Sequence, residues 1–321
     1  MLAPPRDLTV PRTTDTLRRV LSVNLRRLAT EVTRLPLAPS VQRHLRSQLA
    51  SSPGRVFAAL RRPTVSTLIR CSRGGAPQPL LSDVLAAELG VAVPEHVPCI
   101  SRAQPTDAFH PIEREIVLAT VDVNPLAMRE AHPDKSGNAV DLGGHSIERW
   151  TASLRRALAI VERDLPVVRE EIDLLIQQFV PVGFDEQTHL SASYAEAIGT
   201  IYLTLHPNDM TMAEAIVHEH QHNKLNALFD LDPLLQNHAS ERYASPVRPD
   251  PRPLHGILLA VHAFLPVEEL YRRLIERGQT RLTERHAQIV RSNRAAAGLL
   301  SKHARPTKIG RGILDEIAQL S

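Results

Sequence analysis

The hydrophobic residues of this chain recur mostly three and four positions apart, which is the spacing of one face of an α-helix. The pattern predicts helices over most of the sequence, in residues 14–60, 82–89, 146–179, 211–230 and 254–277. Prolines divide the first of these regions into short helices and interrupt the third at Pro166. Two mostly apolar runs without helical spacing, residues 116–123 and 198–205, instead predict buried strands. We therefore expect an α+β fold that is predominantly helical, with a helical N-terminal portion and a small β-sheet next to the helix of residues 211–230.

Two polar segments without periodicity separate these elements. Residues 124–144 and 181–196 exceed the length that a turn requires, and the first is also rich in glycine. They are either solvated loops or loops that cover a site and contact a peptide. Frequent prolines between residues 91 and 111 predict an irregular connection. On this pattern we divide the chain into a helical N-terminal region, residues 1–110, and a catalytic domain, residues 111–321.

Composition narrows the class of protein. Lys and Arg number 38 and Asp and Glu number 35, so the net charge is only +3, and no dense basic run appears. This gives little support to nucleic-acid binding. The sequence contains neither an apolar run of about 18 residues nor an N-terminal signal segment, so we expect a soluble, cytoplasmic protein without a membrane partner. Cys71 and Cys99 lack the spacing of metal ligands, which is typical of proteins in a reducing compartment.

One predicted helix contains the sequence His218-Glu219-x-x-His222. The two histidines lie one helical turn apart on the same face, where both imidazoles can bind one metal ion. Glu219 then lies beside the ion, near a metal-bound water or substrate. With 15 His in the chain this spacing also arises by chance, but the apolar flanks place the pair at the edge of the core, where imidazoles need partners. Upstream, Thr211 and Glu214 predict a capping box at the start of this helix.

A specific metal site needs a third ligand. The predicted helix of residues 254–277 carries His255 and His262, which are seven residues apart and share a face. The neighbours of His262 are apolar, so we predict that His262 is buried and is the third ligand, with His255 as the alternative. A buried His262 that is only hydrogen-bonded within a helix pair is the simpler interpretation.

The segment before that helix is stiffened by four prolines and carries Arg248 and Arg252. Arginines with little conformational freedom near a metal suit the bidentate recognition of a carboxylate. Helix capping or a surface role would also account for them, and Asp250 can pair with either arginine.

Together these motifs carry a resemblance to a family. The run HEHQHNKLNALFDLDPLL, followed by YASPVRPDPRPLHGILLAVHAF, resembles the HExxH-motif peptide-modification proteins encoded with ribosomally made peptide natural products. The stretch VDVNPLAMREAHPDKSGNAVDLGG is also similar, so the resemblance covers roughly residues 115–275. Some members carry a histidine where this chain has Leu259 and an aromatic residue where it has His262, which leaves the third ligand open.

The resemblance implies an Fe(II)- and 2-oxoglutarate-dependent dioxygenase that uses O2 to hydroxylate a β-carbon in a ribosomally synthesised precursor peptide. Fe(II) would be bound by His218, His222 and His262. The distal carboxylate of 2-oxoglutarate would bind Arg252 or Arg248, and Glu219 would orient water or a ligand beside the metal.

Two other classes of protein use the same motif. A zinc metallopeptidase would use Glu219 as the general base on a zinc-bound water, but a hydrolase needs no dedicated arginine anchor for a dicarboxylate. A peptide-binding protein with a structural metal is less compatible, since such zinc sites are closed by four ligands, often cysteines. The oligomeric state and the modified residue cannot be read from the sequence.

Overall fold

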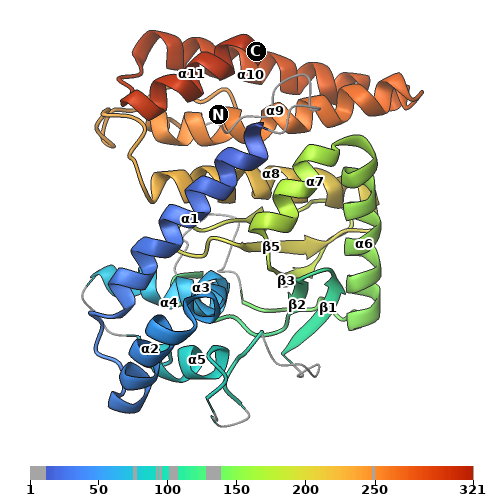
Figure 1. Ribbon diagram of the computed structural model, residues 1–321. Coiled ribbons are helices and arrows are strands. Elements are labelled where there is room, and N and C mark those ends of the chain that lie inside the picture. Colours follow the sequence, from blue (N-terminus) through green and yellow to red (C-terminus); the bar gives the residue numbers. More distant parts are fainter. Residues whose placement is uncertain are drawn as a thin grey trace. The chain divides into compact units, whose positions relative to one another are not determined.

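The computed structural model describes residues 12–74, 78–91, 93, 96–100, 108–127, 139–247 and 250–320. In this part of the chain most residues are helical, and the strands form one five-stranded sheet (Figure 1). The prediction of a predominantly helical α+β fold is confirmed.

Several helices begin at a proline. Three consecutive N-terminal helices start at Pro39, Pro53 and Pro63, and another starts at Pro166. Proline is tolerated in the first helical turn because its missing N–H has no partner there in any case. The helices are α1 (Arg12–Val32), α2 (Pro39–Ser51), α3 (Pro53–Arg61), α4 (Pro63–Cys71), α5 (Leu81–Glu88), α6 (Ile147–Asp164), α7 (Pro166–Leu175), α8 (Asp209–Phe229), α9 (Leu254–Glu276), α10 (Thr283–His303) and α11 (Lys308–Leu320), with short 3-10 helices η1 (Ser72–Gly74) and η3 (Thr280–Leu282).

The sheet has the order β1-β2-β3-β5-β4. Its three central strands, β2, β3 and β5, are parallel, and the edge strands β1 and β4 are antiparallel to their neighbours. The strands are β1 (Phe109–Glu113), β2 (Ile116–Ala119), β3 (Gln178–Phe184), β4 (Ser191–Ala192) and β5 (Thr200–Leu205). The two predicted strands are confirmed as β2 and β5, each shorter than predicted.

The central strand β3 corrects the sequence analysis, which assigned its first residues to a helix and those from Pro181 onward to a loop. Proline and glycine in one short run argue against a strand. Here the carbonyl of Pro181 accepts from the Asp141 N–H at 2.9 Å, and the register shifts between Pro181 and Phe184. This irregularity accommodates Pro181 and Gly183 within the strand. Strand β1 likewise lies partly in the stretch that was predicted to be irregular.

The chain forms two compact units, and each is discontinuous in sequence. One unit comprises Met1–Val20, Arg156–Leu174 and Met210–Ser321; the other comprises Leu21–Arg155 and Leu175–Asp209. The boundaries between the units fall within α1 and α6 and at the last residue of α7 and the first residue of α8. The division into residues 1–110 and 111–321 stays a prediction.

The second unit contains the sheet and α2 to α5. Its helices bury a continuous aliphatic core that includes Leu45, Leu60 and Leu85. A smaller cluster on the sheet contains Phe109, Val180 and Tyr202.

In the first unit, α8 and α9 run antiparallel. The ring of Phe229 lies 5.8 Å from that of His255, and the ring of His218 lies 4.5 Å from that of Phe264. In these contacting pairs the residue number in α8 decreases as the residue number in α9 increases, so the two helices lie side by side in opposite directions (Figure 1).

Helix α9 is long and apolar enough to cross a membrane by length and composition. However, 61% of its most apolar window is buried inside the protein. Such burial is typical of the core helix of a soluble protein, and it is consistent with the expected solubility.

Candidate metal centre

Helix α8 is buried on nearly all sides and keeps one partly accessible stripe. Between residues 211 and 228 the partly exposed side chains are those of Thr211, Glu214, His218 and His222, which are three or four residues apart. Such spacing places them in one row along the helix. The two histidines of the HExxH sequence therefore lie on the face of α8 that a ligand can reach.

The two imidazoles are close enough to share an ion. Their Nε2 atoms are 2.9 Å apart, and the rings meet edge to face with centroids 4.5 Å apart. Glu219 is almost fully buried, and its carboxylate belongs to the same group, in which all candidate ligand atoms lie within 4.8 Å of one another. Metal–imidazole bonds are about 2.0–2.1 Å long, so one ion can bind both nitrogens. The residues present thus fit a divalent metal.

Helix α9 supplies a wall beside this pair. The ring of Phe264 packs against His218, and Ala260 and Gly256 precede it at intervals of four residues. These three positions form one row along α9, opposite the ligand row of α8.

His262 lies elsewhere on α9. It is fully buried and is not a member of the group formed by His218, Glu219 and His222. It is two residues from Phe264 and therefore about 200° around the helix from the ring that contacts His218. His255 is also outside the group; its Nε2 lies 3.2 Å from the carbonyl oxygen of Pro233. The structure does not bring either predicted third ligand to the pair, so that assignment stays a prediction.

The predicted capping box is wrong. Helix α8 begins at Asp209, two residues before Thr211, and Asp209 is the acidic residue of its first turn. Glu214 instead accepts hydrogen bonds from the Tyr271 hydroxyl and, at 2.9 Å, from Arg285. Burial, followed by the charge of Glu214, raises the pKa of Tyr271 well above its ordinary value. An anchored carboxylate thus lies one turn from His218, and sequence spacing alone could not identify its partners on α9 and α10.

Of the two arginines predicted to bind a carboxylate, the structure describes Arg252. Arg248 lies outside the described residues. The Nε of Arg252 donates to Asp250 at 2.7 Å, which was one of the alternatives that the sequence left open. A Cβ added at Gly256 would lie 3.7 Å from both Cβ and Cδ of Arg252, so the stem of Arg252 covers the first turn of α9. Arg252 therefore lies at the start of the row that continues to Phe264.

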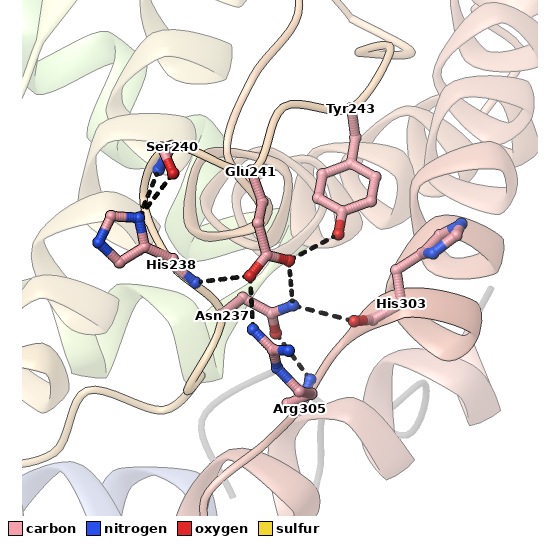
Figure 2. A network of polar contacts seen from close by, with 7 residues as sticks. All are labelled: Asn237, His238, Ser240, Glu241, Tyr243, His303 and Arg305. Carbon is pink, nitrogen blue, oxygen red and sulfur yellow. Dashed lines mark hydrogen bonds and ion pairs between the residues drawn. The ribbon is translucent and has the colours of Figure 1, made fainter.

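A polar network anchors the chain that leads to Arg252 (Figure 2). Glu241 accepts from the backbone N–H of His238 at 3.1 Å, from the amide of Asn237 at 3.2 Å and from the hydroxyl of Tyr243 at 3.0 Å. Arg305 also donates to it, at 2.5 Å. These donors, the His238 N–H foremost, lower the pKa of Glu241 to about 2.

This network has a direct connection to the arginine segment. Tyr243 and Arg252 exchange two backbone hydrogen bonds of 2.8 Å each. The amide of Asn237 also donates to the carbonyl of His303 at 3.0 Å, at the end of α10 (Figure 2). The base of the loop that carries Arg252 is therefore tied to the connection between α10 and α11.

A buried ionic cluster lies on the reverse side of α8. Lys224 donates to both carboxylate oxygens of Glu171, on α7, at 2.8 and 2.7 Å, and no part of either side chain is exposed. Burial alone would raise the pKa of Glu171, but the ammonium of Lys224 and the contact with His220 outweigh it and lower the pKa to about 2. Burial lowers the pKa of His220. Nothing in the sequence patterns identified this cluster.

A second polar cluster lies in the unit that contains the sheet. Both carboxylate oxygens of Asp122 accept from the Tyr202 hydroxyl, at 3.0 and 2.9 Å, and one also accepts from the Asn124 N–H at 3.0 Å. The amide of Asn124 in turn donates to Glu196 at 3.0 Å. Burial raises the pKa of Asp122 to about 6 despite these donors. This cluster fixes the start of the loop of residues 124–144; residues 128–138 of that loop lie outside the described part.

Comparison with known proteins adds no family assignment. No protein-family model matches the chain, and no curated protein is significantly similar to it. The resemblance of residues 115–275 to the HExxH-motif proteins therefore stays an expectation from the sequence.

Proposed function

We propose that this protein is an Fe(II)- and 2-oxoglutarate-dependent oxygenase of the cytoplasm that hydroxylates a β-carbon in a ribosomally synthesised precursor peptide. The observation that carries the proposal is the pair of Nε2 atoms of His218 and His222, 2.9 Å apart on the one accessible stripe of an otherwise buried helix. The reaction class follows from the resemblance of the surrounding sequence.

His218 and His222 would hold the ion, and two residues compete for a third ligand position. Glu219 is in the group and would complete a set of two histidines and one carboxylate, which is typical of non-haem Fe(II) oxygenases. His262, the third ligand that the resemblance implies, would complete a set of three imidazoles instead. When bound, the ion supplies open positions at which co-substrate and O2 react.

Phe264 and Arg252, at the two ends of the row on α9, would orient a metal ligand and bind the co-substrate. Phe264 packs on His218, which fixes the imidazole ring and keeps water from one side of it. Arg252 already binds one carboxylate, that of Asp250, and would exchange it for the distal carboxylate of 2-oxoglutarate. Because one carboxylate replaces another, the exchange preserves the charge balance of the arginine.

The test is turnover by protein purified without oxygen and loaded with Fe(II). We expect one equivalent of bound iron, conversion of 2-oxoglutarate to succinate in the presence of O2, and a peptide that gains one oxygen atom. His218→Ala and His222→Ala should lose both metal and turnover. His286→Ala is the matched control, since His286 lies on α10 outside the group, and it should keep both.

The zinc metallopeptidase is the alternative, and the closeness of Glu219 to both imidazoles favours it. In a peptidase Glu219 must accept a proton from the attacking water, so Glu219→Gln would remove nearly all turnover while metal stays bound. In an oxygenase in which Glu219 only orients a ligand, Glu219→Gln keeps measurable hydroxylation. In an oxygenase in which Glu219 is the third ligand, Glu219→Gln weakens metal binding as well as turnover. Peptide cleavage that needs neither 2-oxoglutarate nor O2, and that Glu219→Gln abolishes, would refute the oxygenase proposal.

A further inference from the structure

Helix α8 carries two pairs of polar side chains on opposite faces. His218 and His222 lie on the accessible stripe, whereas His220 and Lys224 are completely buried. The two members of each pair are four residues apart. The second pair begins two residues after the first, which corresponds to a rotation of about 200° around the helix axis. The His218–His222 pair and the His220–Lys224 pair therefore lie on opposite faces of the same stretch of α8.

The buried pair meets one carboxylate. Glu171 on α7 accepts from Lys224 through both oxygens, at 2.8 and 2.7 Å, and its Oε2 lies 3.6 Å from Nε2 of His220. All three side chains have no exposed surface. We call Glu171, His220 and Lys224 the rear triad.

A buried ionic cluster restrains a helix in a way that aliphatic packing does not. Hydrophobic burial is non-directional, so a helix packed by aliphatic side chains alone can roll or slide with small changes in buried area. Separation of paired charges in the core leaves both without solvation, which is strongly unfavourable. The rear triad therefore fixes the rotation of α8 about its own axis and its position along α7.

Rotation of α8 decides whether the two imidazoles reach one ion. A helix with its side chains is about 10–12 Å across, so a roll of about 10° moves a side-chain tip by roughly 1 Å. Metal–ligand distances are held to within about 0.2 Å in working sites. A restraint on the roll of α8 is thus a restraint on metal affinity.

We infer that the rear triad of Glu171, His220 and Lys224 is a positioning device that sets the geometry of the His218–His222 metal pair from the opposite face of α8. The inference rests on the metal site of the proposed function, and it holds whichever reaction that site performs.

The test removes both charges together. Lys224→Met alone would leave Glu171 buried and unpaired and could unfold the protein, whereas Glu171→Gln/Lys224→Met removes the pair with little change in volume. Val168→Ala, at a fully buried aliphatic position of α7, is the stability control. Lys224→Arg, which keeps the charge and two donors, is the conservative variant.

The measurements are Zn(II) and Co(II) affinity by competition with a chelator, the absorption spectrum of bound Co(II), and the melting temperature of the metal-free protein. We expect the double variant to fold, to bind both ions about 10- to 100-fold more weakly, and to show a changed Co(II) spectrum. Lys224→Arg should recover part of the affinity, and Val168→Ala should lower the melting temperature without changing affinity.

Two results would overturn the inference: wild-type affinity in the folded double variant, or a loss no larger than that of Val168→Ala. Wild-type protein that binds metal but hydroxylates no peptide would refute the proposed function alone and leave the rear triad as inferred. Wild-type protein that binds neither ion would refute both.

Discussion

Asp122 makes folding stability depend on pH in a direction opposite to that of most carboxylates. Its pKa rises from an ordinary 3.8 to about 6, chiefly because the group is buried. An acid whose pKa is higher in the folded protein favours folding while it is protonated in both states. That contribution is complete below about pH 4 and is lost as the pH rises through 6.

The perturbation is Asp122→Asn, which removes the charge but keeps an oxygen that accepts from Tyr202 and Asn124. The shift of about two pKa units corresponds to about 3 kcal/mol, at 1.36 kcal/mol for each unit. The variant should therefore be more stable than the wild type by up to about 3 kcal/mol at pH 7.5, and the difference should approach zero at pH 4.

Urea unfolding of both proteins at pH 4, 5, 6 and 7.5 measures this difference and cancels the titration of all other groups. Asp185→Asn is the control of opposite sign, because hydrogen bonds from Thr188 foremost lower the pKa of Asp185 to about 2. It should destabilise the protein by a similar amount at all four pH values, because a contribution from a lowered pKa is lost only as the pH falls from about 4 towards 2. A pH-independent difference for Asp122→Asn, or destabilisation at pH 7.5, would show that burial does not control this carboxyl group.

Three further substitutions test other parts of the first unit. Arg252→Ala should weaken 2-oxoglutarate binding by an amount on the order of 2–3 kcal/mol in a titration of turnover, and unchanged affinity would remove Arg252 from the co-substrate site. Gln221→Leu should leave the melting temperature unchanged or raise it, because both polar atoms of this buried amide lack a hydrogen-bond partner among the described residues; a clear decrease would contradict that reasoning. Gly310→Ala should lower the melting temperature markedly, since the new Cβ would lie 1.9 Å from the carbonyl oxygen of Leu234, and an unaltered melting temperature would mean that α11 does not dock there.

The candidate site was predictable from sequence as far as it depends on one helix. The spacing of His218 and His222 places both rings on one face in any α-helix, and the prolines that interrupt the apolar pattern correctly marked the starts of α2, α3 and α7. Local geometry determines these features, so a short window of sequence contains them.

Features that depend on two distant segments were not predictable in this way. Strand β3 contains Pro181 and Gly183, and it is a strand because β2 and β5 pair with it on both sides. Glu214 fits a capping box by spacing, yet its carboxylate binds partners on α9 and α10 instead.

The sequence by itself determined the helical class of the fold and the pair of imidazoles that could bind a metal, because both follow from periodicities of a few residues. Only the tertiary structure decided that Glu219 lies close to both imidazoles while His262 lies outside this group. It also decided that Lys224, on the opposite face of α8, binds Glu171. Helix packing sets these distances, and the rotation of one helix against another leaves no mark on the spacing of residues within either.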